Sequence, residues 1–71
     1  MFTCKQVRAG DIGNDVLLLE EILKARGLYN GALDRSFGSQ LDAAVRSYQA
    51  DRHLAIDGIC GPATWNDLIA L

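Results

Sequence analysis

The sequence predicts an all-α fold, a small bundle of three helices. Apolar residues recur at helical spacing in three segments, and Gly or Pro stands at the ends of these segments. No segment alternates apolar and polar residues over the length of a strand. Because 71 residues, 49% of them hydrophobic, suffice for one small core, we expect a single domain over residues 1–71. Residues 1–10 are expected to lie extended across the bundle, anchored by Phe2 or Val7.

The first helix is expected from about residue 14 to residue 26. Asn14 or Asp15 can cap its N-terminus, and Gly27 can take the left-handed conformation that ends a helix. The apolar stripe of this helix contains Val16, Leu18, Leu19, Ile22 and Leu23. The connection after it, residues 28–34, is rich in turn residues, and both of its leucines, Leu28 and Leu33, are expected to point inward.

The second helix is expected to open at Gly38-Ser39 and to run to about residue 52. Its apolar face contains Leu41, Ala44, Val45 and Tyr48. A loop over residues 53–61 follows, and Pro62 then suits the first position of a third helix, where a missing amide costs nothing. The residues of this short helix expected in the core are Trp65, Leu68 and Ile69.

A loop-to-helix unit occurs twice in the chain. Residues 34–41 align with residues 57–64 at an offset of 23 residues, so that Asp34 matches Asp57 and Gly38 matches Gly61. Each Asp can accept hydrogen bonds from loop amides, and each Gly can let the backbone turn tightly into the following helix. We therefore expect these four residues to hold two pseudo-repeated loops in shape.

The order of these motifs is typical of a known family. The matching residues are Gly13-x-x-Val16, Gly27-Leu28-Tyr29-Asn30-Gly31, Asp34-x-x-Phe37-Gly38, Ala44-Val45, Tyr48-Gln49, Leu54, Asp57-Gly58-Ile59-x-Gly61-Pro62-x-Thr64-Trp65 and Leu68. Together they resemble the bacterial peptidoglycan-binding domain of the three-helix type, over nearly the whole chain. The chain departs from the family pattern at three positions, with Arg35 and His53 where Gly is usual and Leu41 where Thr is usual.

The resemblance implies a non-catalytic module that binds bacterial cell-wall peptidoglycan and directs an attached wall hydrolase to its substrate. Such modules occur in cell-wall hydrolases and endolysins, so the resemblance also implies an extracellular or wall-associated place of action. The alternative on the same scaffold is a protein-docking unit, or a metallopeptidase pro-segment, without wall affinity. Cys60-Gly61-Pro62 is superficially similar to the motif with which such pro-segments ligate zinc.

Six residues are candidates for contact with the glycan strand or the stem peptide: Tyr29, Asn30, Arg35, Arg46, Gln49 and Trp65. An aromatic ring and an amide on a loop, as at Tyr29 and Asn30, can reach a ligand, although Tyr29 can instead pack over Leu33. The two arginines can pair with a stem-peptide carboxylate. Gln49 can face a ligand or cap a carbonyl group, and Trp65 is expected in the core before it is expected to stack on a ligand.

Catalysis finds little support in the sequence. The adjacent residues Glu20 and Glu21 point about 100° apart on a helix, so they cannot face each other as an acid and base pair. Glu20 is instead expected off the apolar stripe, paired with Lys24 one turn later. The one histidine, His53, has no cysteine in a recognisable activating context. We expect a binding module without cofactor or metal.

The net charge and the number of cysteines limit the classes of partner that the protein can bind. A net charge of −2 and a third helix without Lys or Arg disfavour a nucleic-acid binder, and the N-terminus has no apolar run that would enter a membrane. The same charge favours a monomer. Two cysteines are too few for a zinc site. Cys4 and Cys60 are expected either to form a disulfide or to remain two thiols, and the sequence leaves this choice open.

Overall fold

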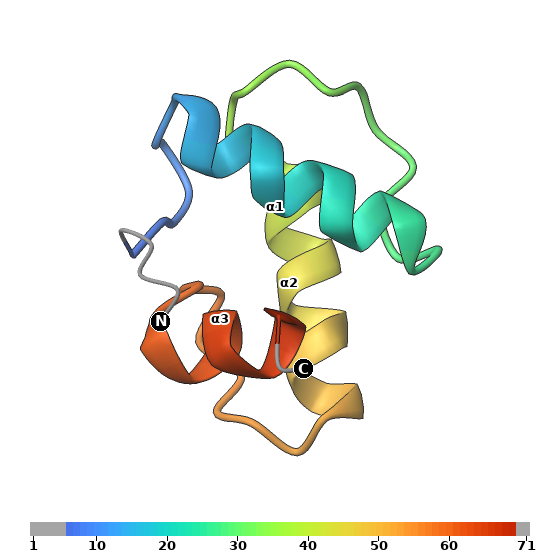
Figure 1. Cartoon of the computed structure of the whole chain (residues 1–71), viewed down its shortest axis with the longest axis vertical. Coiled ribbons are helices and arrows are strands. Elements are labelled where there is room, and N and C mark those ends of the chain that lie inside the picture. The colour runs from blue at the N-terminus through green and yellow to red at the C-terminus, as the bar shows by residue number, and fades with distance from the viewer. Residues whose placement is uncertain (1–5, 70–71) are drawn as a thin grey trace.

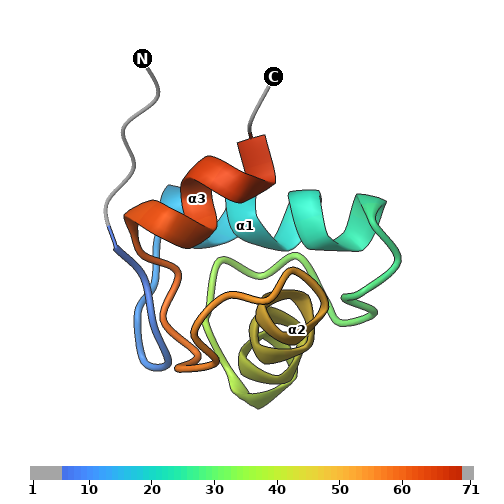
Figure 2. The same cartoon turned by 90° about the horizontal axis from the view of Figure 1, so that it is seen from below.

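The three expected helices are present. The computed structural model describes residues 6–69, in which α1 (Asn14–Ala25), α2 (Ser39–Asp51) and α3 (Pro62–Ile69) are joined by two long loops (Figure 1). Seen nearly along α2, both α1 and α3 lie across the same side of that helix (Figure 2). Two isolated β-bridges are the only strand-like pairing among the described residues, so the all-α prediction is confirmed.

The core takes one face of each helix and several loop residues. Its buried members are Val7, Val16, Leu19, Leu23, Tyr29, Phe37, Leu41, Ala44, Val45, Tyr48, Cys60, Trp65 and Leu68. Leu28, Leu54 and Ile69 are partly buried against this cluster, as expected. The expectation for Leu33 is wrong, because its side chain is 42% exposed and Tyr29 enters the interior from the same connection instead.

The two ends of α1 differ from each other in how well they were predicted. Gly27 has a φ of +79° and the Leu28 N–H donates to the Leu23 carbonyl oxygen, which confirms the glycine stop. The expected cap by Asn14 or Asp15 is wrong. Gly13 is the N-cap and no side chain caps the helix, because Asn14 Oδ1 accepts a hydrogen bond from Arg35 Nε at 3.1 Å instead.

Residues 7–13 join the two loops by backbone pairing. Val7 and Cys60 exchange both N–H to carbonyl bonds, at 3.2 and 2.8 Å. The Gly10 N–H donates to the Phe37 carbonyl, and the Phe37 N–H donates to the Asp11 carbonyl. Val7 is 2% exposed, which confirms it as the anchor of this segment. Phe2 and Cys4 lie outside the described residues, so the choice between a Cys4–Cys60 disulfide and two thiols stays open.

Candidate ligand-binding site

The first loop (residues 28–38) and the second loop (residues 53–61) end in the same local structure. Asp34 Oδ1 accepts the Ser36 N–H at 3.0 Å, and Asp57 Oδ1 accepts the Ile59 N–H at 2.9 Å. These backbone hydrogen bonds lower the pKa of both carboxyl groups. Both aspartates therefore hold a loop amide through a local hydrogen bond.

The helix-opening glycines are not left-handed, and one left-handed residue of the second loop, His53, lies at its start. Gly38 has a φ of −104°, which any residue adopts, and Gly61 also lies outside the positive-φ region. Positive φ occurs instead directly after the aspartates, at Arg35 (62°) and Gly58 (72°). The expectation that Gly38 and Gly61 supply conformational freedom is thus wrong, although both precede the helices as expected.

Gln49 holds the second loop from beneath. Its Nε2 lies 3.0 Å from Asp57 Oδ1 and 3.2 Å from Thr64 Oγ1, and it also reaches the Ile59 carbonyl oxygen. Its Oε1 accepts the Gly58 N–H at 3.1 Å. The residue is 1% exposed. Of its two expected roles, capping the loop is the one that these contacts support.

A hollow of about 240 Å³ lies over this amide, and we call it the second-loop hollow. It is lined by Gln6, Gln49, Leu54, Ala55, Asp57, Ile59, Gly61, Pro62, Ala63 and Thr64. A cavity of about 150 Å³ holds benzene, so this hollow has room for a sugar substituent or a short peptide side chain.

The walls of the second-loop hollow are chemically mixed. Leu54 and Ile59 supply aliphatic surface, while the first turn of α3 presents backbone N–H groups that have no partner within the helix. Arg46 lies beside it, since its Nη2 donates to the Asp57 carbonyl oxygen at 3.4 Å, and it pairs with Asp42 at 3.1 Å. Such a hollow can take a ligand that carries both apolar and carbonyl groups.

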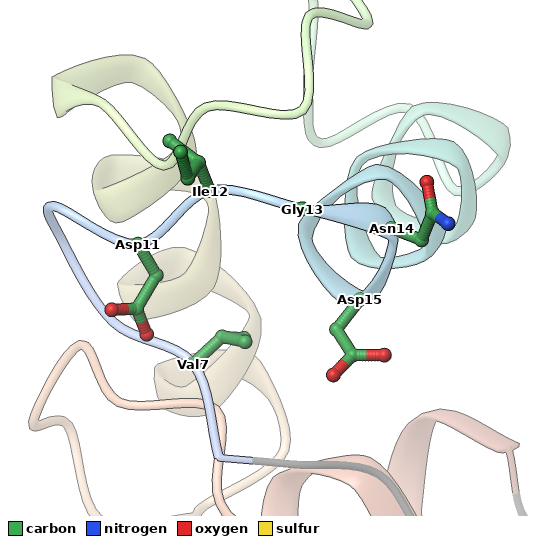
Figure 3. Close-up of a pocket in the computed structure, with 6 residues that line it drawn as sticks. All are labelled: Val7, Asp11, Ile12, Gly13, Asn14 and Asp15. Atoms are coloured by element: carbon green, nitrogen blue, oxygen red, sulfur yellow. The ribbon is translucent and has the colours of Figure 1, made fainter.

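A smaller hollow of about 150 Å³ lies between the N-terminal segment and α1 (Figure 3). In Figure 3 the carboxylates of Asp11 and Asp15 lie on one side of this segment, with Val7 beside them, and the Asn14 amide points away. No predicted ligand-contacting residue lines it. Within residues 6–69 no group of three or more His, Cys, Asp or Glu residues is placed to hold a metal ion.

The structure separates the six predicted ligand residues. Gln49 lines the second-loop hollow and Arg46 borders it, whereas Asn30 and Arg35 are exposed on the first loop. The remaining two, Tyr29 and Trp65, are buried in the core, with exposed fractions of 4% and 2%, because their rings fill the interior. Their rings are therefore not presented to a ligand.

Sequence reasoning missed several residues of the hollow, among them Gln6, Ala55 and Ala63. The signal available for Ala63 was its place directly after Pro62, in the first turn of a helix. Cys60 is fully buried and its backbone pairs with Val7, so the domain does not present it to a zinc ion outside. The pro-segment alternative loses its one supporting residue.

Comparison with known proteins decides the family. Residues 12–68 match the family model described as "Putative peptidoglycan binding domain". This chain belongs to that family. The peptidoglycan-binding domain is 46% identical over 59 residues to the N-acetylmuramoyl-L-alanine amidase CwlM of Mycobacterium tuberculosis, and 34% identical over 68 residues to a spore cortex-lytic enzyme of Oceanobacillus iheyensis.

The domain is a small part of these relatives. The matches cover 83% and 96% of this chain but only 14% of the amidase and 25% of the cortex-lytic enzyme. Among solved structures, the SleB N-terminal domain is similar with a TM-score of 0.91, 33% identity and coverage of 97% of this chain and 94% of that chain. The Burkholderia AP3 phage endolysin matches with a TM-score of 0.88 and 42% identity, over 93% of this chain and 25% of its own.

By their printed names three of these relatives are an amidase, a spore cortex-lytic enzyme and an endolysin, and the domain matches one part of each. No helix within residues 6–69 of the peptidoglycan-binding domain combines the length and apolar character that crossing a bilayer requires. The fold and the family expected from the sequence are confirmed.

Proposed function

We propose that this domain binds bacterial cell-wall peptidoglycan and holds a wall hydrolase, of which it is one part, on its substrate. The family match over residues 12–68 carries this proposal. The named relatives support it, because an amidase and cortex-lytic enzymes contain the same module in a small part of their length. The domain itself then acts as a binding module rather than an enzyme, at the wall outside the cell.

The proposed contact surface is the second-loop hollow. Its hydroxyl and backbone N–H groups suit the carbonyls and hydroxyls of a wall polymer, and its aliphatic walls suit the methyl groups. Arg46 at the border is 48% exposed and can offer a ligand carboxylate the guanidinium N–H groups that its bonds to Asp42 and Asp57 leave over. Binding by a surface this small is weak for one monomer, but it raises the local concentration of a tethered enzyme.

The test is sedimentation with purified peptidoglycan sacculi, with chitin as the control polymer. We expect the folded domain to pellet with sacculi and to stay in solution with chitin. Ala63→Trp should fill the hollow and reduce pelleting about tenfold. The matched control is Ala43→Trp, which adds the same ring at an exposed α2 residue outside the hollow.

The outcomes separate function from site. A domain that is folded by circular dichroism but stays in the supernatant with sacculi would refute the proposed function. Equal pelleting of the wild type and the Ala63→Trp variant would move the contact surface away from the second-loop hollow. In that case Asn30 and Arg35 on the first loop are the next residues to substitute.

A further inference from the structure

The loop-helix unit that contains Asp34 has a space that corresponds to the second-loop hollow. In this first unit the space is occupied by residues of the chain itself. Its floor and wall can be matched residue by residue. Glu20 Oε1 accepts the Arg35 N–H at 3.1 Å, as Gln49 Oε1 accepts the Gly58 N–H at 3.1 Å. Arg35 and Gly58 occupy the same left-handed position after the two aspartates. Glu20 is therefore the structural counterpart of Gln49.

The wall of the hollow that faces Gln49 also has a counterpart in the first unit, which the sequence repeat identifies. The offset of 23 residues that pairs Asp34 with Asp57 also pairs Gln40 with Ala63. Both residues lie in the first turn of a helix, Gln40 in α2 and Ala63 in α3. In the second unit the space between Gln49 and Ala63 is the open hollow.

In the first unit a peptide segment fills the corresponding space. Tyr29 Oη lies 3.3 Å from Glu20 Oε2 and 2.6 Å from the Ala32 carbonyl oxygen. A Cβ atom added at Gly31 would lie 2.5 Å from Gln40 Oε1 and 2.6 Å from Tyr29 Oη. The segment from Tyr29 to Ala32 thus lies between Glu20 and Gln40, and a side chain at residue 31 would require Gln40 or Tyr29 to move.

The difference in chain length explains why one space is filled and the other is open. Fourteen positions separate Glu20 from Asp34, whereas eight separate Gln49 from Asp57. The six extra residues of the first loop allow it to fold back over its own floor. The second loop is too short to do so, and Ala55 and Ala63 leave the space above Gln49 unfilled.

We infer that the second-loop hollow binds the stem peptide of peptidoglycan rather than its glycan strand, with residues 29–32 of the same chain acting as an internal analogue of that ligand. This inference rests on the proposed function. The analogue is a peptide that places a residue without a side chain, Gly31, against Gln40, and it reaches the Glu20 carboxyl with the Tyr29 hydroxyl. A stem peptide, rich in alanine, offers similarly small residues, and its carbonyl groups suit the backbone N–H groups in the first turn of α3.

The walls of the hollow agree with a peptide occupant. The first turn of α3 offers backbone N–H groups to carbonyl or carboxylate oxygens, and the exposed guanidinium of Arg46 lies beside the same space. Leu54 and Ile59 offer aliphatic contact for methyl groups. No aromatic side chain lines the hollow, so it lacks the flat surface on which a sugar ring would stack.

The experiment is a competition in the sacculus sedimentation assay, with backbone amide NMR of the domain in parallel. The competitors are a soluble synthetic stem pentapeptide and peptide-free glycan strands. We expect the stem peptide to release the domain from sacculi and to shift the amide signals of Gly58, Gly61 and Ala63. We expect the glycan strands to do neither.

Two exchanges between the units sharpen the test. Ala63→Gln places in the second unit the glutamine that the first unit has at the matching position, Gln40. This variant should weaken stem-peptide binding about tenfold. Gln40→Ala, the reverse exchange in the first unit, should leave binding unchanged. Unfolding midpoints of both variants establish that each is folded.

The possible results distinguish the inference from the proposed function. If sacculi bind the domain and glycan strands compete while the stem peptide does not, the inference is wrong and the proposed function stands. If sacculi do not bind the folded domain at all, the proposed function fails and the inference fails with it. Equal stem-peptide affinity of the wild type and the Ala63→Gln variant would also overturn the inference.

Discussion

The two loop-helix units of this domain share a frame but differ in what they place inside it. Both have an aspartate that accepts a loop amide and a left-handed residue directly after it. The first unit places a carboxyl group, Glu20, beneath the loop and covers it with Tyr29. The second unit places a neutral amide, Gln49, beneath the loop and leaves a hollow above it. Two copies of a repeat can therefore share the same local loop conformation while the space above the floor residue is filled in one copy and open in the other.

The comparison predicts that the second loop depends most on Gln49. Gln49→Leu removes the partner of the Gly58 N–H and leaves the Asp57, Ile59 and Thr64 acceptors without this amide. Because the buried Gly58 N–H and Thr64 hydroxyl lose a partner together, we expect the free energy of unfolding to fall by about 3 kcal/mol. Urea unfolding measures it. Gln40→Leu, at an exposed glutamine, is the matched control and should change stability by less than about 0.5 kcal/mol.

The left-handed position of the second loop should be the next most sensitive. Gly58 has a φ of 72°, and a Cβ atom there would lie 2.6 Å from Asp42 Oδ1 and 2.7 Å from Arg46 Nη2. Gly58→Ala should destabilise the domain by about 2 kcal/mol through strain and displacement of this ion pair. Gly38→Ala, at the N-cap of α2 where φ is ordinary and no atom lies near, should cost less. Equal losses for the two variants in thermal unfolding would show that conformation is not the cause.

Glu20 in the first unit can titrate, whereas Gln49 in the second unit cannot. The stability of the domain should therefore depend on pH through Glu20. Burial is the main cause that raises the pKa of Glu20, and the nearby Asp34 carboxyl raises it further, against the Arg35 N–H and the Tyr29 hydroxyl. The folded state therefore binds this proton more tightly than the unfolded chain. The contribution of protonated Glu20 to the stability of the fold is fully present below its ordinary pKa of 4.5. This contribution is lost as the pH rises through the higher pKa that Glu20 has in the folded state.

Glu20→Gln tests this pH dependence because it gives the first unit the amide of the second. The variant should be more stable than the wild type at neutral pH, and the difference should shrink as the pH falls toward 4.5. Urea unfolding at a series of pH values measures both. Glu21→Gln, one residue along and exposed, is the control. A pH-independent difference between wild type and Glu20→Gln would contradict a titrating Glu20.

The smallest expected effect concerns the two non-glycine residues with positive φ within residues 6–69. His53, after α2, has a φ of 61° and an exposed side chain. His53→Gly should raise the free energy of unfolding by about 0.5 to 1 kcal/mol, because glycine adopts this conformation without steric cost. Arg35→Gly should gain less, since it also removes the hydrogen bond from Arg35 Nε to Asn14. A larger gain for Arg35→Gly in calorimetry would show that this bond contributes nothing.

Much of the fold followed from spacing alone. Apolar residues at helical intervals predicted the three helices and most of the core, because burying such a stripe is the main source of stability for a helix. Gly27 and Pro62 marked two helix boundaries through backbone properties that do not depend on context. Asp34 and Asp57 predicted the two loops, because the hydrogen bonds that they accept come from only two residues along the chain.

The exceptions are residues whose partners lie far away in the sequence. Asn14 bonds to Arg35 rather than to its own helix, and Glu20 is buried because Tyr29 and Arg35 close over it. Local patterns treat both side chains as solvent-facing polar groups. Such contacts depend on how the first loop folds back over α1, and no local preference encodes that path.

The amino-acid sequence by itself determined the helices, the repeat and the family, since these rest on periodicity, turn residues and motif order. Only the tertiary structure decided which copy of the repeat is open. That choice depends on packing between residues that are distant in the chain, with Tyr29 filling one space while the short second loop leaves the other above Gln49. Filling a space requires the right volume at the right distance, and a linear pattern carries neither quantity.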